Sequence, residues 1–250
     1  MPKMVPISFE QHGKKCLLQL YSYSFTAEQN LAVLVATEFA AAAHSFPIVF
    51  VKPEDKYLPM ALLGLKPDSN LLVDNKGKWQ ADYIPAAFRR YPFNFIRTGK
   101  DDAVSYVLGI DEESGFLTEG KGEPLFTAEG KPGRLLEQAL QFASEYQKQV
   151  PLTSKLCEML EQHALLSPLR LTLQEKEKKI NIEGLLVVDE KKLNALSDES
   201  FLALRSAGLI SLIYLHLFSI KKIPVLTSRL KKINGSSHEN PKVLPKSFKF

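Results

Sequence analysis

The sequence of 250 residues is poor in cysteine, with Cys16 and Cys157 as its only two. Neither belongs to a C-x-x-C spacing, so the sequence offers no disulfide framework, zinc-ribbon motif or dithiol redox motif. Cys157 lies among the apolar positions of a predicted helix, which indicates a packed thiol and not a nucleophile. A reducing cytoplasm is therefore the compartment that we expect.

Long hydrophobic runs are also lacking. The longest uncharged apolar run, AGLISLIYLHLFSI, covers only residues 207–220, whereas a helix needs about 20 residues to span a bilayer. The first residues, MPKMVPISFEQHGKK, do not combine a basic flank with an apolar core, as a cleaved signal peptide does. We expect a soluble protein with no membrane span and no signal peptide.

Motifs for nucleotides, metals and nucleophilic catalysis are missing as well. The glycine-containing segments match neither a P-loop nor a dinucleotide fingerprint, and no G-x-S-x-G or H-E-x-x-H occurs. The histidines are scattered, with no pair at i and i+4: His12, His44, His163, His216 and His238. We therefore expect no cofactor, no metal and no recognisable catalytic motif.

Negative charge is scarce at the C-terminal end. Residues 221–250 contain eight lysines or arginines against Glu239 alone, whereas the whole chain has a formal charge of +4. No nucleic-acid motif accompanies these charges. Residues 229–250 are predicted to be a basic, flexible tail that makes at most weak contacts with anionic partners, and no specific nucleic-acid partner is expected.

The first half of the chain predicts one helix followed by short strands. Thr26-Ala-Glu-Gln29 has the pattern of a capping box, which predicts a largely buried helix to about His44. Pro47 ends it and IVFV, residues 48–51, is typical of a strand. The segment NLLVDNKGKW, residues 70–79, predicts a β-hairpin because Asn75-Lys-Gly77 tolerates positive φ. Another strand is expected in 102–111 and a hairpin in 116–133.

In the second half the hydrophobic period becomes helical. An apolar stripe predicts a helix over 133–150, which Pro151 breaks or kinks before a second helix begins. Strands follow at 169–173 and 180–188, and a helix capped by Ser197 ends at Gly208. The predicted class is α+β: a mainly antiparallel sheet of short hairpins, packed with an N-terminal buried helix, a central helical hairpin and C-terminal helices. Residues 1–228 are expected to form a single domain.

The segment YIPAAFRRYPFNF, residues 83–95, places two adjacent arginines among aromatic residues. Arg89 and Arg90 either bind an anion or hold the segment onto the core, because a guanidinium group suits both roles. Glu38, in an otherwise apolar helix, is a candidate internal partner for one of them. If the segment is extended, the two side chains point to opposite faces, so one arginine pairs with Glu38 and the other faces a ligand.

Seven segments, in this order, resemble the bacterial SapC family over about residues 5–225. The most specific are NLLVDNKGKW (70–79) and YIPAAFRRYPF (83–93); the others are FPIVFV, ALLGL, EYQ, GLLVVDEKKLNAL and LIYLHLFSI. The positions that match the family pattern are His12, Glu38, Asp74, Trp79, Arg89, Arg90, Tyr91 and Asp189. A peptide-transport permease shares the family's name. A permease would need several membrane-spanning helices, and because this sequence predicts none, we do not expect a transporter.

The resemblance implies a soluble, cytoplasmic bacterial accessory protein linked to surface-layer or peptide biogenesis. Its partner would be a peptide, a protein or a small ligand. The predicted ligand-binding residues are Arg89, Arg90, Trp79, Tyr91 and Asp74. Two alternatives stay open: an enzyme on an amino-acid or peptide substrate, with Glu38 or His12 as the acid or base, and a purely structural subunit.

Overall fold

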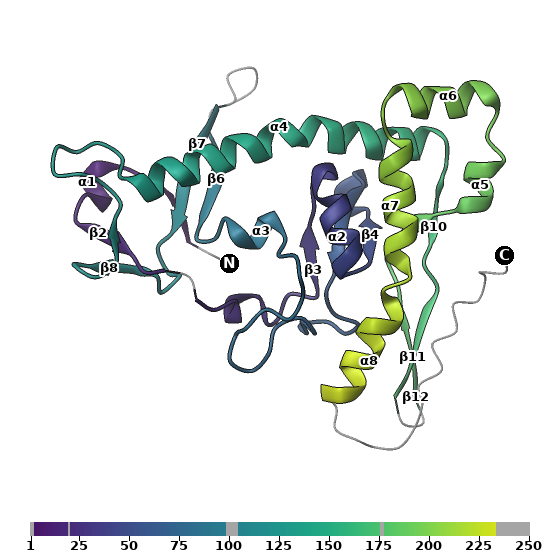
Figure 1. The fold of residues 1–250 in the computed structure, drawn as a ribbon, viewed down its shortest axis with the longest axis horizontal. Coiled ribbons are helices and arrows are strands. Elements are labelled where there is room, and N and C mark those ends of the chain that lie inside the picture. The colour runs from purple at the N-terminus through teal and green to yellow at the C-terminus, as the bar shows by residue number, and fades with distance from the viewer. Residues whose placement is uncertain (1–2, 20, 99–104, 176–177, 234–250) are drawn as a thin grey trace. The chain divides into compact units, whose positions relative to one another are not determined.

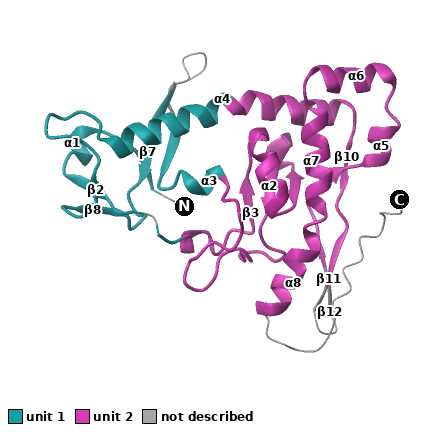
Figure 2. Cartoon of the chain, in the orientation of Figure 1, with its two compact units in different colours: residues 1–22, 86–148 teal, residues 23–85, 149–250 magenta. Residues whose placement is uncertain are grey.

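The computed structural model describes residues 3–19, 21–98, 105–175 and 178–233. It combines helices with several small antiparallel sheets, which confirms the α+β class (Figure 1). The chain divides into two compact units (Figure 2): unit 1 contains residues 1–22 and 86–148, and unit 2 contains residues 23–85 and 149–250. The single domain expected over residues 1–228 stays a prediction.

Unit 1 contains two antiparallel three-stranded sheets with the strand orders β1-β7-β6 and β8-β2-β9. The strands are β1 (Met4–Pro6), β2 (Lys15–Leu17), β6 (Phe93–Thr98), β7 (Ser105–Asp111), β8 (Leu117–Glu119) and β9 (Glu123–Pro124). The hairpin predicted in residues 116–133 does not form between β8 and β9, which pair with the two edges of β2, and within this range only Phe126 and Pro132 form an antiparallel bridge. The distant strand β2 therefore pairs with the two segments that the local sequence pattern predicted to pair with each other.

The helices of unit 1 are α1 (Phe9–His12), α3 (Ala86–Arg89) and the first part of α4 (Arg134–Gln162). Its hydrophobic core takes residues from both sheets and from α4: Leu17, Phe93, Leu108, Ile110, Leu125, Phe126, Leu136 and Ala143. Burying these apolar side chains is the main favourable contribution to the stability of the unit.

Unit 2 is built on a five-stranded antiparallel sheet with the order β10-β13-β4-β5-β3. Its strands are β3 (Leu31–Val33), β4 (Ile48–Val51), β5 (Leu58–Leu62), β10 (Leu166–Pro168) and β13 (Leu186–Val188). The predicted strand IVFV is confirmed as β4, the middle strand, and its first three residues are buried, as a strand covered on both faces requires. Helices α2 (Phe39–Ser45) and α7 (Ile210–Ile220) pack against each other and against β4.

The helix predicted from Thr26 to about His44 is largely wrong. Only its last part is α-helical, as α2, which is preceded by the 3-10 turns at Ser24–Thr26 and Ala36–Glu38. Residues 31–33 instead form β3, paired with β5. The Thr26 hydroxyl donates to the Tyr23 carbonyl and does not accept the amide that a capping box requires. Long-range strand pairing thus overrides a plausible local helix signal.

The predicted helical hairpin is also wrong, because α4 runs from Arg134 to Gln162 with Pro151 inside it. Proline removes one helical hydrogen bond and clashes with the preceding turn, at a cost of about 3 kcal/mol. On the far side of the proline, Leu156 and Leu160 are fully buried. Burying a leucine contributes roughly 1.5–3 kcal/mol, so two such side chains offset the proline and keep the helix continuous.

The remaining elements follow the sequence more closely. Ser197 caps α6 (Asp198–Ser206) by accepting the Ser200 amide, and Gly208 follows with a φ of 72°, both as predicted. The other elements are a two-stranded pair and two helices: β11 (Leu171–Glu175), β12 (Lys178–Ile182), α5 (Glu190–Asn194) and α8 (Ile223–Ile233). Of the predicted tail, residues 229–233 belong to α8, and the rest lies outside the described residues.

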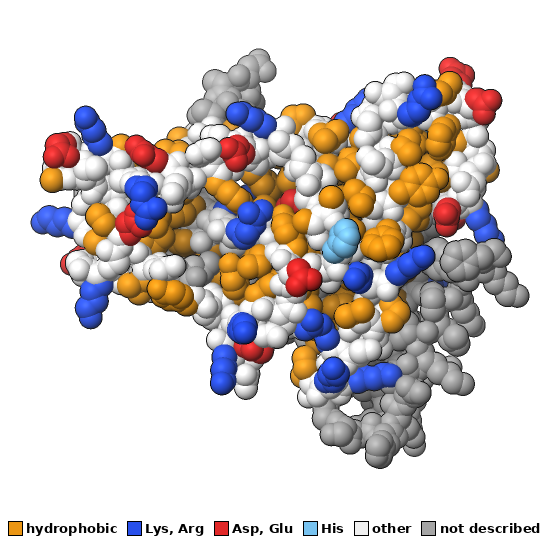
Figure 3. Space-filling model, in the orientation of Figure 1, with side chains coloured by type: hydrophobic (Ala, Val, Ile, Leu, Met, Phe, Trp, Pro, Cys, Tyr) orange, Lys and Arg blue, Asp and Glu red, His pale blue; other side chains and the backbone are white. Residues whose placement is uncertain are grey.

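The stretch Ile210–Ile233, which holds α7 and α8, is long and apolar enough by length and composition to cross a membrane. A core helix can have the same composition, and α7 contributes the buried Ile213, His216 and Ile220 to unit 2. Tyr214 and Phe218 are exposed along α7, where hydrophobic side chains reach the surface shown in Figure 3. The expected absence of a membrane span stays a prediction.

Candidate functional site

The two adjacent arginines lie at the end of a helical turn. Ala86–Arg89 form α3, which buries Phe88, and the amide of Arg90 continues the turn by donating to the Ala86 carbonyl at 3.1 Å. The extended segment expected here, with its two side chains on opposite faces, is therefore wrong. Arg89 and Arg90 line the same pocket in unit 1.

This pocket has a volume of about 310 Å³. Its walls come from the end of β2 and the residues after it, the segment from the end of α3 to the start of β6, Phe116, and one face of α4. The α4 residues recur every three or four positions, as a single helical face requires. The lining is Leu17, Leu18, Gln19, Arg89, Arg90, Tyr91, Pro92, Phe93, Asn94, Phe95, Phe116, Leu135, Gln138, Ala139, Phe142, Ala143 and Tyr146.

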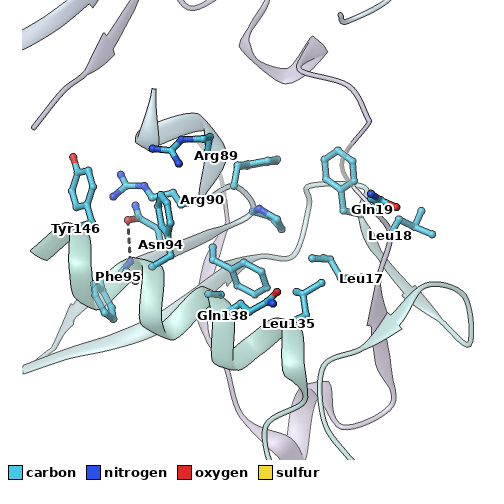
Figure 4. A pocket seen from close by; sticks show the side chains of 17 residues that line it. Leu17, Leu18, Gln19, Arg89, Arg90, Asn94, Phe95, Leu135, Gln138 and Tyr146 are labelled. Atoms are coloured by element: carbon cyan, nitrogen blue, oxygen red, sulfur yellow. Dashed lines mark hydrogen bonds between the residues drawn. The ribbon is translucent and has the colours of Figure 1, made fainter. Parts of the chain in front are cut away.

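Each arginine is held against an aromatic ring of α4. The Arg89 guanidinium carbon lies 5.2 Å from the Phe142 ring centroid, and that of Arg90 lies 4.9 Å from the Tyr146 centroid. In Figure 4 the two arginines are grouped with Asn94 and Tyr146 at one end of the pocket, and Leu17, Leu18 and Gln19 lie at the other. Such stacking fixes a guanidinium plane by its face, and a guanidinium group donates to anions through the N–H groups at its edge.

The pocket lining contains two arginines and no aspartate or glutamate. Arginine stays protonated at any physiological pH, so the lining has a formal charge of +2. Among the described residues, no carboxylate forms a salt bridge with Arg90. The remaining walls are mostly phenylalanine, leucine and alanine, with amide groups at Gln19, Asn94 and Gln138. The arrangement suits an anionic group attached to an apolar body.

Tyr91 lines the pocket, and a hydrogen bond to Asp111 holds its hydroxyl group. The hydroxyl donates to Asp111 Oδ2 at 2.9 Å, and the buried Asp111 also accepts the Lys3 and Glu113 amides through Oδ1. Burial and the hydrogen bond to Asp111 raise the pKa of Tyr91 to about 12. The phenol therefore stays protonated and positions the ring.

Glu38 is buried, with 5% of its surface exposed, as the sequence predicted. Its carboxyl group accepts the Val35 amide at 2.9 Å and the Tyr83 hydroxyl at 2.8 Å. The predicted pairing of Glu38 with an arginine stays a prediction.

Asp74 and Trp79 belong to unit 2 and do not line this pocket. Asp74 Oδ1 accepts the amides of Lys76 and Lys78, each at 2.9 Å, and closes the predicted turn, where Val73 and Trp79 form an antiparallel bridge. The Trp79 indole donates to the Tyr83 carbonyl at 2.8 Å. These contacts hold the local structure, and the predicted ligand-binding roles of both residues stay predictions.

His12 is buried, with only 1% of it exposed. Ser8 caps α1, whose last residue is His12, and the ring Nδ1 lies 3.2 Å from the Ser8 carbonyl oxygen. Nε2 lies 3.5 Å from a Glu112 carboxylate oxygen and has no hydrogen-bond partner in the described residues. His12 does not line the pocket, and its role as an acid or base stays a prediction.

Two other residues singled out by the sequence serve structural contacts. Asp189 caps α5 by accepting the Lys191 amide at 3.0 Å and also accepts the Ser167 hydroxyl at 3.1 Å. Cys157 is buried, as predicted, and burial raises the pKa of its thiol to about 12. Within the described ranges, no group of three or more histidine, cysteine or acidic side chains is arranged to hold a metal ion.

Comparison with known proteins identifies the family. The SapC family model matches residues 7–226, nearly the whole chain, so the protein belongs to the SapC family. No curated protein and no solved structure matches the chain at a significant level.

Sequence reasoning missed the part of the site that α4 contributes. Phe142 and Tyr146 are four residues apart, so both lie on one helical face, and Tyr146 was assigned only to an apolar stripe. That spacing was a signal for a shared surface. It did not show that the surface contacts an arginine pair more than 50 residues earlier in the chain, because only the tertiary fold brings these segments together.

Proposed function

We propose that this SapC-family protein is a binding protein whose pocket in unit 1 takes an anionic ligand with an apolar or aromatic body. The observation that carries the proposal is the pair of ring-stacked arginines in a pocket with no acidic side chain. A volume of about 310 Å³ is at the lower end of the roughly 300–1,000 Å³ of small-molecule sites. It suits a small molecule or a short part of a peptide.

The wider role that we propose is that of a soluble, cytoplasmic accessory protein in surface-layer or peptide biogenesis. This part rests on the family resemblance. The pocket adds a chemical criterion for the ligand, since apolar amino acids, and peptides that end in one, carry a carboxylate next to an apolar side chain.

The test uses two small probes that differ in one group. N-acetylphenylalanine has a free carboxylate, and N-acetylphenylalaninamide has the same body without the charge. Ligand-observed NMR on the full-length protein should detect the acid and show much weaker binding of the amide. A hydrogen bond to a charged group contributes about 1.5–3 kcal/mol, so Arg90→Ala should weaken binding of the acid about 10- to 100-fold.

The control for charge is Arg134→Ala. Arg134 lies in the same unit with 71% of its side chain exposed, pairs with Glu123, and does not line the pocket. Arg90→Ala should lower the melting temperature by only a few degrees, because a cation–π contact contributes about 0.5–1 kcal/mol. Equal binding of acid and amide, or equal losses in the two variants, would contradict the proposal. Loss of cooperative unfolding in Arg90→Ala would assign the arginine to the core.

The alternative class, an enzyme that uses Glu38 or His12, has a separate test. It predicts turnover of an amino-acid or peptide substrate from a metabolite mixture, and Glu38→Gln or His12→Gln should abolish it. Neither residue lines this pocket, which is why binding is the function we favour. A purely structural subunit would instead show a stoichiometric protein partner and no stabilisation by either probe.

A further inference from the structure

The pocket meets the open edge of a β-strand. Within the described residues, β6 pairs with β7 alone and is the outer strand of the order β1-β7-β6. Residues 91–95, which lead into β6, line the pocket without a break. Because successive side chains of a strand point to opposite faces, a pocket on one face would be lined by alternate residues. The unbroken lining places the start of the strand, with its backbone, at the pocket.

The direction of the backbone groups on β6 follows from the hydrogen bonds of β7. The Leu108 carbonyl accepts the Ile7 amide at 3.0 Å, so the backbone groups of Leu108 point toward β1. Phe95 lies opposite Leu108 in the β6–β7 register and is therefore in a non-hydrogen-bonded pair. Its N–H and C=O point away from β7, toward the open edge.

Both outward amides at the start of β6 are held by nearby groups of the same segment. The backbone groups of Phe93, two residues earlier, also point away from β7, and the Phe93 amide donates to the Arg90 carbonyl at 2.8 Å. The Phe95 amide donates to the side-chain oxygen of its neighbour Asn94 at 2.9 Å (Figure 4). The Phe93 amide is bound by a backbone carbonyl of the preceding turn. The Phe95 amide is bound only by a side chain, which can rotate away. Phe95 is thus the position at which an added strand can pair.

The charge of the pocket selects the direction of such a strand. Arg89 and Arg90 come just before β6 begins. An added strand antiparallel to β6 brings its C-terminal end to this point, and its carboxylate then meets the two guanidinium groups. A parallel strand would bring a positively charged N-terminus to the same place, where like charges repel.

We propose that the pocket binds the free C-terminus of a peptide or protein by adding it as an antiparallel strand to β6. The terminal carboxylate is bound by Arg89 and Arg90, and a residue shortly before it exchanges backbone hydrogen bonds with Phe95. The apolar face of α4, with Phe142, packs on the last side chain. This inference rests on the proposed function and narrows its ligand class.

The probe is the peptide Ala-Ser-Ala-Leu-Phe with an N-terminal fluorescein and a free C-terminus, titrated with the full-length protein and followed by fluorescence anisotropy. Its C-terminal amide should bind at least about 10-fold more weakly, because the charged acceptor is lost. Two further peptides each carry one N-methyl group, the first on the second alanine and the other on the adjacent leucine, and they form a matched pair. Backbone groups of an added strand alternate in direction, so one methyl group should weaken binding about 10-fold and the other should change it less than about 3-fold.

Asn94→Ala adds a protein variant. It frees the Phe95 amide, so the affinity for the peptide divided by the affinity for N-acetylphenylalanine should stay as in the wild type or rise, and a fall in this ratio would contradict pairing at Phe95. Equal effects of the two methyl groups, or a peptide that binds no more tightly than N-acetylphenylalanine, would overturn strand addition and leave the proposed function standing. If neither the peptide nor N-acetylphenylalanine binds, the proposed function itself fails.

Discussion

His216 offers a direct test of the core of unit 2 through the pH dependence of stability. The side chain is fully buried, and the Val188 amide donates to its Nε2 at 3.0 Å. Burial lowers the pKa of His216 from its ordinary 6.5 to about 3, and the nearby backbone of Ile48 offsets this lowering only in part. In the folded protein the imidazole is therefore neutral well below neutral pH, whereas in the unfolded chain it takes up a proton below about 6.5.

The unfolded state thus binds more protons between these two pKa values, and stability falls as the pH drops through that window. The slope is about 1.4 kcal/mol per pH unit. Between pH 7 and pH 5 the loss of unfolding free energy from this one group is about 2 kcal/mol. Above pH 7 His216 contributes almost no pH dependence.

The perturbation is His216→Gln, whose amide oxygen can still accept the Val188 amide but does not titrate. Urea unfolding at pH 7 and pH 5 is followed by fluorescence of Trp79, the single tryptophan, which belongs to the same unit as His216. Between pH 7 and pH 5 the free energy of unfolding of the wild type should fall by about 2 kcal/mol more than that of the variant. His44→Gln, at an exposed histidine, is the control for removing an imidazole. Equal pH slopes in wild type and His216→Gln would refute the reasoning.

Two further predictions concern buried groups. Burial, with Glu158 and Glu161 nearby, raises the pKa of Cys157 to about 12, so Ellman's reagent at pH 8 should titrate one thiol of the native protein. The Cys16→Ser variant should react only after unfolding, and rapid native reaction would contradict the buried thiol. Tyr83→Phe removes the 2.8 Å hydrogen bond to Glu38 and should destabilise the protein by about 0.5–1.5 kcal/mol in urea unfolding. The exposed Tyr214→Phe should change stability less, and equal effects would show that the Glu38 contact contributes nothing.

The parts of the fold that could be predicted are those fixed by neighbouring residues. Ser197 and Gly208 set the ends of α6, and IVFV forms a buried strand, because the cap, the positive φ and the branched side chains act within a few residues. The turn at Asp74–Gly77 is local in the same way, with Asp74 accepting the amides that close it.

The errors arise where a distant segment competes with a local preference. Residues 31–33 have an acceptable helical pattern, yet they form β3, which pairs with residues 60–62 of β5 and buries Ala32. Pro151 is an acceptable helix end, yet the buried leucines beyond it keep α4 continuous. Strand β2 inserts between β8 and β9, whose own connection suggested a hairpin. None of these partners is adjacent in the sequence, so a local pattern does not contain the decisive interaction.

The candidate site shows the same limit in its most aromatic segment. In the sequence, Trp79 to Phe95 looks like one cluster, but the chain passes from unit 2 to unit 1 between Pro85 and Ala86. Trp79 and Tyr83 therefore serve unit 2, while the arginines face a wall that α4 supplies. It follows that a variant at Trp79 alters a different unit from the pocket. Trp79→Phe should therefore leave carboxylate binding unchanged, and impaired binding with unit 1 intact would contradict a purely local role for Trp79.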